Sequence, residues 1–154
     1  MKTLFVISDT HGNGEKIKKL LPIMEESDFV IHLGDYITDT RYLSEKVYEK
    51  LYAVKGNCDG GGDDLIVEVE NKKILLTHGD RYGVKQGNLK LLLKAKEIGV
   101  DAVFFGHTHK SLTEEVDGIT FVNPGTLSRY SNKSYAYVVI ANDKITAKIV
   151  DIPE

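Results

Sequence analysis

The chain has 154 residues, of which 42% are hydrophobic and 28% are charged, and its formal net charge is −3 at pH 7. This balance excludes a disordered chain or a fibrous repeat, and the length predicts a single domain over residues 1–154. The acidic balance also offers no general attraction for nucleic acid, so a phosphate-binding site would need positive charge of local origin.

The first two thirds of the chain alternate between strand and helix patterns. Runs rich in β-branched and apolar residues predict strands over residues 3–8, 29–33, 51–55, 65–70, 73–77 and 102–105. Helical stripes of apolar residues fall between them, at Ile17, Leu20, Leu21 and Met24, and more briefly at Leu43 and Val47. A third helix is expected from Asn88, as its N-cap, to Gly99. This alternation is typical of parallel βαβ units.

The last third of the chain changes to alternating strands joined by tight turns. Asp117-Gly118 is the strongest hairpin signal, and Asn142-Asp143 is a second. Asn71-Lys72 indicates a further hairpin in mid-chain. We therefore expect α/β layers that mix parallel and antiparallel pairs, and an exposed strand such as residues 135–141 would allow a homo-oligomer.

Polar residues follow the predicted strands at the points where those strands end. In chain order these are Asp9 and His11, Asp35, Asn57 with Cys58 and Asp59, His78, and finally His107 and His109. Loops at the carboxyl ends of strands in an α/β sheet border the same crevice, so these side chains are expected to converge. Imidazole and carboxylate ligands together suit borderline divalent metals.

These motifs resemble those of the calcineurin-like metallophosphoesterase superfamily. The resemblance rests on Asp9-x-His11, Gly34-Asp35, Gly56-Asn57, His78-Gly79 and Gly106-His107-x-His109, in that order. Asn57-Cys58-Asp59 and Asn123-Pro124-Gly125 are similar to the small bacterial and archaeal phosphodiesterase branch. The resemblance implies a layered α/β/β/α sandwich of two mixed β-sheets flanked by helices.

The resemblance also implies a site for two divalent metal ions. It assigns Asp9, His11 and His109 to the first metal, Asn57, His78 and His107 to the second, and Asp35 to a bridge between them. We expect manganese, with nickel, cobalt, iron and zinc as alternatives. A hydroxide between the metals would attack a phosphodiester, with Asn57, Asp35 and His78 as the catalytic residues. The positive charge of two divalent cations exceeds the negative charge of two carboxylates and a hydroxide. Such a site would therefore supply the local positive charge that phosphate binding needs.

Cys58 departs from the superfamily pattern, because many members have a histidine there that stabilises or protonates the reacting groups. A thiol cannot act as an imidazolium, so we expect a small phosphodiester substrate, with a phosphomonoester of a small metabolite as the alternative. A non-catalytic scaffold is the third possibility, since a subunit of the retromer sorting complex resembles this fold. No stable nucleic-acid binding is expected.

Other polar residues receive plainer interpretations. We expect His32 to be a hydrogen-bonded core histidine, and Cys58 to be a small, partly buried residue without a nucleophilic role. Arg129 is either a phosphate clamp or a solvated charge, residues 123–126 form a turn, and Asp59 remains unassigned.

The cysteine content and the amino terminus favour a cytoplasmic location. Cys58 is the one cysteine and cannot form an internal disulfide, which is typical of a reducing compartment. The apolar stretch before Ser8 is too short for a secretory signal, and no apolar run approaches the ~20 residues that cross a bilayer. We therefore expect no membrane contact.

Overall fold

The strands form two mixed five-stranded sheets in the computed structural model, which describes residues 1–153. The first sheet has the order β10-β9-β1-β2-β3. Its strands are β1 (Lys2–Ile7), β2 (Phe29–His32), β3 (Leu51–Ala53), β9 (Lys133–Ala141) and β10 (Lys144–Ile152). β1, β2 and β3 pair in parallel, whereas β9 pairs antiparallel with both β1 and β10.

The second sheet has the order β4-β5-β6-β8-β7. Its strands are β4 (Leu65–Val69), β5 (Lys72–Thr77), β6 (Ala102–Phe105), β7 (Leu112–Val116) and β8 (Ile119–Asn123). β5, β6 and β8 are parallel in the centre, and β4 and β7 are antiparallel at the two edges.

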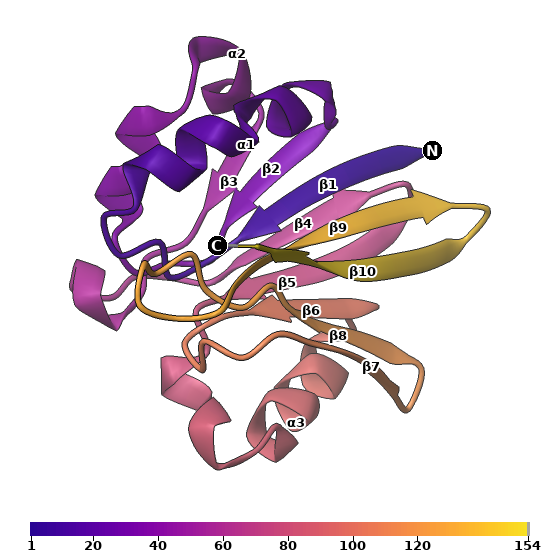
Figure 1. Ribbon diagram of the computed structural model, residues 1–154. Helices are drawn as coiled ribbons and strands as arrows, with labels where there is room; N and C mark the ends of the chain where they lie inside the picture. Colours follow the sequence, from indigo (N-terminus) through magenta and orange to yellow (C-terminus); the bar gives the residue numbers. More distant parts are fainter. Residues whose placement is uncertain (154) are drawn as a thin grey trace.

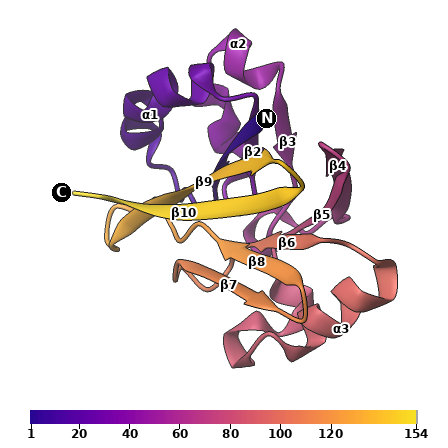
Figure 2. The ribbon, with the colours of Figure 1, turned by 90° about the vertical axis from the view of Figure 1, so that its right-hand side faces the viewer.

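Helices cover the outer face of each sheet, so the layers are helix, sheet, sheet and helix (Figures 1 and 2). α1 (Gly14–Glu26) and α2 (Glu45–Tyr48) lie on the first sheet, and α3 (Leu89–Ile98) lies on the second. Short 3₁₀ turns connect these elements: η1 (Ile37–Tyr42), η2 (Asn57–Asp59), η3 (Asp80–Tyr82) and η4 (Val84–Gln86). The predicted α/β/β/α sandwich is confirmed.

Strand β1 shows why the central strands are continuous apolar runs. Successive side chains of a strand point to opposite faces, so Leu4 and Val6 pack between the two sheets while Phe5 and Ile7 pack under α1. All of these side chains are at most 1% exposed. Burial on both faces fixes the register of β1, and the register in turn fixes where its carboxyl end leaves the sheet.

Two of the predicted hairpin turns are confirmed, and the third lies one residue earlier than expected. Asp117-Gly118 and Asn142-Asp143 are two-residue loops in which both residues have positive φ. In mid-chain, Val69 pairs with Lys72, so the loop is Glu70-Asn71 rather than Asn71-Lys72. The register decides this because Lys72 is needed as a strand residue opposite Val69.

Two further expectations are corrected. Asn88 does precede α3, but its side chain makes no capping hydrogen bond; Gly99 ends the helix in the left-handed conformation, as predicted. The strand over residues 135–141 is not an exposed edge, because β9 is hydrogen-bonded to β1 on one side and β10 on the other. The sequence pattern of a strand does not reveal its neighbours, and the long hairpin with β10 supplies the second one here.

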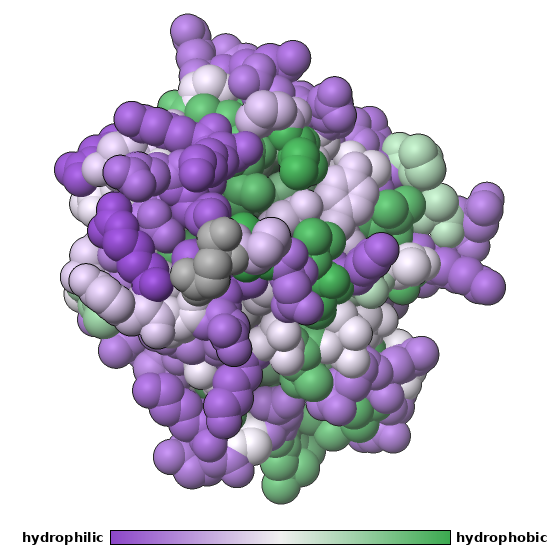
Figure 3. Space-filling model, in the orientation of Figure 1, coloured by the Kyte–Doolittle hydropathy of each residue, from purple (hydrophilic) through white to green (hydrophobic). Residues whose placement is uncertain are grey.

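The surface is mostly hydrophilic on the face drawn in Figure 3, with apolar residues exposed in patches rather than across the whole face. Among the described residues, none of the helices has the length and apolar character needed to cross a bilayer.

Candidate metal centre

The loops at the strand ends carry most of their candidate ligands in a strained backbone conformation. Five of the seven predicted ligands have positive φ: Asp9 (53°), His11 (45°), Asp35 (65°), His107 (71°) and His109 (63°). This region is uncommon for residues other than glycine, and it persists only where the surroundings impose it. The strain points to a site at these strand ends.

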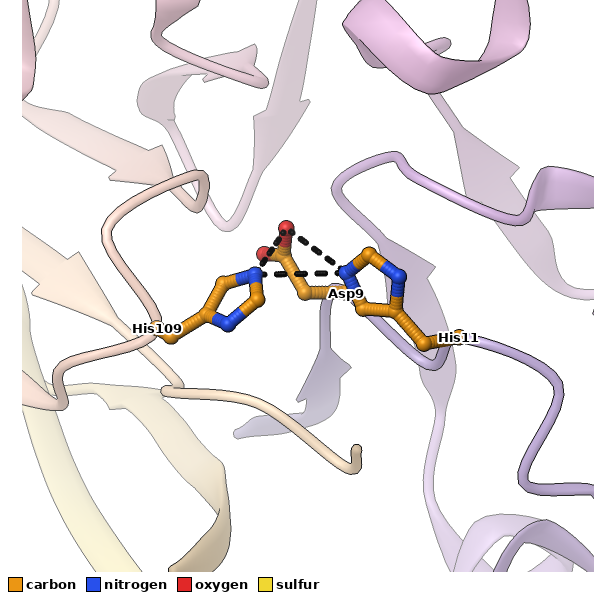
Figure 4. A group of neighbouring side chains, drawn as sticks. All are labelled: Asp9, His11 and His109. Carbon is orange, nitrogen blue, oxygen red and sulfur yellow. Dashed lines mark hydrogen bonds and ion pairs between the residues drawn. The ribbon is translucent and has the colours of Figure 1, made fainter. Parts of the chain in front are cut away.

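The first candidate group joins the loops after β1 and β6. The side chains of Asp9, His11 and His109 point toward one another, with the two histidines approaching from opposite sides (Figure 4). Nε2 of His11 lies 3.2 Å from Nε2 of His109, and Oδ1 of Asp9 lies 3.2 Å from His109 Nε2. Two ring nitrogens and a carboxylate oxygen at such distances can hold one cation.

The second candidate group consists of Asp35, His78 and His107, which follow β2, β5 and β6. Nε2 of His78 lies 3.4 Å from Oδ1 of Asp35 and 3.2 Å from Nδ1 of His107. Nδ1 of His78 lies 2.8 Å from the carbonyl oxygen of Leu33 and donates its hydrogen there. The Nε2 lone pair therefore faces the centre of the group, as a metal ligand requires.

Asp9 connects the two groups and has the property expected of a cation ligand. Its Oδ2 accepts hydrogen bonds from Ser8 Oγ at 2.5 Å and from the backbone N–H of His107 at 3.0 Å. Its Oδ1 is buried and has no hydrogen-bond partner among the described residues. That oxygen also lies 3.9 Å from Nε2 of both His11 and His78. A buried carboxylate oxygen without a donor is costly unless a cation occupies its lone pairs, so this donor set fits divalent metals.

Asp35, a member of the second group, also faces His11 of the first group. Its Oδ2 is 4.0 Å from Nε2 of His11, and its Oδ1 accepts a hydrogen bond from the backbone N–H of Cys58 at 2.9 Å. Asn57 begins the η2 turn in the same loop as Cys58 and is exposed. Six of the seven predicted ligands fall in the two candidate groups, with Asp35 in the second. The bridging role of Asp35 and the ligand role of Asn57 remain predictions.

The ionisation of these side chains follows from their burial and contacts. Burial opposes the charge of Asp9, but the contacts with His109 and His78 outweigh it and lower the pKa of Asp9. The contact with Asp9 raises the pKa of His109, whereas burial lowers the pKa of His107. Asp9 is therefore an anion at neutral pH, and His107 is a neutral imidazole with a lone pair to donate.

The glycines of the motifs are required by close packing between the loops. A Cβ on Gly34 would lie 2.6 Å from the backbone nitrogen of Gly56 and 2.8 Å from Nδ1 of His78. A Cβ on Gly106 would lie 2.8 Å from Oδ2 of Asp9. Any larger residue would push apart the loops that carry Asp35, His78 and Asp9.

Asp59, which the sequence left unassigned, joins two of these loops. Its Oδ2 accepts hydrogen bonds from the backbone N–H groups of Asp35 at 2.8 Å and Gly56 at 3.0 Å. Its Oδ1 accepts from Ile37 N–H at 2.9 Å. Asp59 is therefore a positioning residue that holds Asp35 in its left-handed conformation. An aspartate two residues after Asn57 was visible in the sequence, but its bonding partners were not.

The segment at residues 123–126, predicted as a turn, begins with the last residue of β8 and ends at the bridge residue Thr126, and it fastens two ligand loops to each other. Asn123 donates from Nδ2 to the carbonyl oxygen of Gly106 at 3.1 Å, while its Oδ1 accepts from Gly125 N–H. Thr126 Oγ1 donates to the carbonyl oxygen of Asp9 at 2.7 Å. Sequence reasoning identified the segment but missed these two positioning side chains.

His32 is a buried, hydrogen-bonded histidine, as expected. Its Nδ1 accepts from Gly34 N–H at 3.0 Å, so the ring hydrogen is on Nε2, which lies 3.1 Å from Thr10 Oγ1. Thr10 in turn donates to Oδ2 of Asp39 at 2.6 Å, and the same oxygen accepts from Gly12 N–H. This chain of hydrogen bonds supports the turn between Asp9 and His11. Neither Thr10 nor Asp39 stood out in the sequence.

Cys58 lies beside the candidate ligand Asp35, whereas Arg129 lies apart from the candidate ligands. Cys58 is exposed rather than partly buried, and its pKa is raised by the burial it retains and by the neighbouring carboxylate of Asp35. Arg129 is exposed and lines a separate cavity of about 210 Å³ with Lys16 and Lys19 on α1. This position agrees with the interpretation of Arg129 as a solvated charge.

Comparison with known proteins finds relatives over nearly the whole chain. The family model for the calcineurin-like phosphoesterase superfamily domain matches residues 1–144. The probable metallophosphoesterase YsnB of Bacillus subtilis is 36% identical, and the match covers 96% of this chain and 90% of that protein. The phosphodiesterase MJ0936 of Methanocaldococcus jannaschii is 31% identical, with coverage of 81% and 84%.

A solved structure agrees with these relatives. A conserved protein of Streptococcus pneumoniae, described as a predicted phosphoesterase, matches with a TM-score of 0.80 and 26% identity, over 97% of this chain and 89% of its own. The matched range of the family model includes all of the loops that carry the candidate ligands.

Proposed function

The chain belongs to the calcineurin-like phosphoesterase superfamily, and within it we propose that the protein is a phosphodiesterase that uses two divalent metal ions. Manganese is the ion we expect, with nickel, cobalt, iron and zinc as alternatives. The substrate is a small phosphodiester. Membership of the family supports phosphoester hydrolysis, and the geometry of the side chains supports the finer proposal.

One observation carries the proposal. The buried Oδ1 of Asp9 lacks a hydrogen-bond donor, and ring nitrogens of His109, His11 and His78 surround it at 3.2 to 3.9 Å. These contacts place one unsatisfied anionic oxygen between two groups of ligand atoms. The unsatisfied oxygen supports a cation at the first group, and the presence of a second group of ligand atoms supports a pair.

The chain's own residues hold and orient the components of the reaction. Asp9 and Asp35 supply the negative charge that retains cations, and the neutral ligands Asn57, His78 and His107 leave the centre positive overall. When bound, such cations supply charge for the phosphoryl oxygens and lower the pKa of a coordinated water. Nδ1 of His78 donates its hydrogen to the carbonyl oxygen of Leu33, so Nε2 keeps a free lone pair. His78 therefore acts as a ligand and not as a proton donor.

The preference for a diester rests on Cys58. A thiol carries no positive charge in either ionisation state, so Cys58 cannot assist a dianionic monoester as an imidazolium would; its raised pKa keeps it neutral rather than anionic near pH 7. A diester carries one negative charge less and depends less on such help. The phosphomonoesterase reading is therefore the weaker one.

The test is metal analysis combined with a pair of assays. The protein, stripped with chelator and reloaded, is expected to retain about two metal ions per chain and to hydrolyse bis(4-nitrophenyl) phosphate faster than 4-nitrophenyl phosphate. Faster cleavage of the monoester would replace the proposal with a phosphomonoesterase. A metal-loaded protein inert toward both would support the scaffold.

Matched variants show whether the activity belongs to this centre. Asp9→Asn keeps an acceptor for Ser8 and the N–H of His107 but loses the anionic oxygen, so metal content and hydrolysis should both fall by roughly a hundredfold. Asp151→Asn, at an exposed position on β10, is the control and should match the parent. Circular dichroism confirms that both variants fold. Full activity in Asp9→Asn would contradict the assignment.

A further inference from the structure

A second cavity lies beside the candidate metal centre, on the side of the second sheet covered by α3. Its volume is about 610 Å³, within the range of pockets that hold small organic ligands. Val84, Phe105 and Leu112 provide its apolar lining, and Thr108, Lys85 and Lys110 provide much of its polar part. None of the metal-ligand assignments above uses this cavity.

The cavity shares its walls with the loops that carry the candidate ligands. Thr108 lies between His107 and His109 in the chain, and its Oγ1 accepts hydrogen bonds from Asn123 Nδ2 at 3.0 Å and from Lys110 N–H at 3.1 Å. A group bound in the cavity would therefore lie next to the phosphoryl group of a substrate held at the metal centre.

The opposite wall of the cavity packs against the loop that carries His78, a member of the second candidate group. A Cβ on Gly79, which follows His78, would lie 3.1 Å from Cγ2 of Val84 in the η4 turn. The next residue, Lys85, is exposed and lines the same cavity. The same turn thus contacts the ligand loop and brings a cation to the cavity.

The charge of the cavity is positive. Lys85 and Lys110 are both exposed, and the residues that line the cavity include no carboxylate. Gly87 and Asn88 place the start of α3 at the cavity, where the Asn88 side chain makes no capping hydrogen bond. The first backbone N–H groups of this helix add to the attraction for an anion. On a chain of net charge −3, this is a local reversal of sign.

We propose that this cavity binds one ester arm of the substrate, and that this arm combines a flat or apolar body with a second phosphate, as a nucleoside monophosphate does. The apolar lining by Val84, Phe105 and Leu112 accommodates the body, while Lys85 and Lys110 bind the phosphate. The inference rests on the proposed function, because it names the class of diester that this centre cleaves. A short dinucleotide with a terminal phosphate has this chemistry.

The binding arm of the test does not depend on hydrolysis. Thymidine 3′,5′-bisphosphate is titrated into the metal-free protein in the presence of chelator, and amide chemical shifts are followed by NMR. Shifts are expected at Thr108, Lys110 and Asn123, with weaker binding of thymidine and of inorganic phosphate. Lys85→Gln combined with Lys110→Gln should weaken binding of the bisphosphate by about tenfold or more. Lys94→Gln, on α3 outside the cavity, should not change it.

The activity arm uses the metal-loaded protein and dithymidine monophosphate with and without a terminal phosphate. The parent should have the higher kcat/KM for the phosphorylated dinucleotides, and the ratio between the two kinds should fall toward one in the double lysine variant. Equal kcat/KM values in the parent would overturn the inference, as would unchanged binding in the double variant. Binding without hydrolysis of any diester would contradict the proposed function alone, whereas hydrolysis of diesters that lack a terminal phosphate, without bisphosphate binding, would contradict this inference alone.

Discussion

At the scale of single residues, the candidate ligands are costly to hold where they are. A left-handed conformation at a residue other than glycine costs of order 1 kcal/mol or more, and Asp9, His11 and Asp35 all adopt it. Specific hydrogen bonds hold these residues in that conformation. Thr126 donates to the carbonyl oxygen of Asp9, for example, and Asp59 accepts from the N–H of Asp35. The surroundings therefore fix ligand directions that the local sequence disfavours.

Cys58 provides the first prediction at this scale. Cys58→His adds a group that can carry positive charge and donate a proton, so cleavage of 4-nitrophenyl phosphate should rise by roughly tenfold or more. Metal content, measured by elemental analysis, should stay the same because the backbone N–H of Cys58 still donates to Asp35 in the variant. Cys58→Ser is the control for a simple change of the side chain. Unchanged monoesterase activity would contradict the explanation of substrate preference.

His32 makes stability depend on pH. Burial lowers the pKa of His32 to about 4 in the folded protein, so the unfolded chain binds the proton more readily between about pH 6.5 and about pH 4. Stability from this residue is present above pH 6.5 and is lost as pH falls, by about 1.4 kcal/mol per pH unit. Urea unfolding of the metal-free protein at pH 7 and pH 5 measures this loss. The loss should be smaller in His32→Gln, and an identical loss would refute the assignment.

At the scale of elements, the connecting loops are tied to each other rather than merely linking strands. Asn123, after β8, holds the loop after β6, and Asp59 in η2 holds the loop after β2. These bonds cross between segments far apart in the chain. Each loop is thus ordered by a neighbour, which keeps the ligands in place through bonds from outside the ligand groups.

Asp59 allows a prediction for these ties. Asp59→Ala removes the acceptor for the N–H groups of Asp35, Gly56 and Ile37, so the free energy of unfolding should fall by about 1–3 kcal/mol. Metal affinity, measured by calorimetry, should weaken as well because Asp35 loses its support. Asp63→Ala, at an exposed position four residues on, is the matched control. A variant as stable as the parent and unchanged in metal affinity would contradict the positioning role.

At the scale of the whole molecule, each candidate group takes ligands from both sheets. Asp9, His11 and Asp35 follow strands of the first sheet, whereas His78 and the His107–His109 loop follow strands of the second. A cation held by either group would therefore link the two halves of the sandwich. Metal binding and the packing of the central core are coupled through this arrangement.

This coupling predicts stabilisation by metal. At a metal concentration about a hundredfold above Kd, the folded state should gain about 2.7 kcal/mol, which corresponds to a rise in Tm of roughly 5–10 °C. Differential scanning calorimetry with manganese and with chelator measures the difference. Asp9→Asn should show no such rise, and magnesium-free buffer with chelator gives the baseline. An equal Tm with and without metal would contradict binding at this centre.

The sequence by itself determined the elements and the chemistry at their ends. Alternating and helical apolar patterns identified β1, β2, β6 and the helices, because local periodicity follows from which side of an element is buried. The histidines and aspartates after these strands indicated a metal site, because residue type alone limits ligand chemistry. The pattern at Asp117-Gly118 likewise specified its turn through the φ angles those residues tolerate.

Only the tertiary structure decided which separated groups meet. The sequence could not show that Asp59 binds the N–H of Asp35, that β9 lies between β1 and β10, or that Val84 packs against Gly79. Pairings of this kind depend on the register and packing of segments remote in the chain, and no local pattern encodes them. The orphaned oxygen of Asp9 belongs to the same class, because whether a buried polar atom finds a partner is settled only when all of its neighbours are in place.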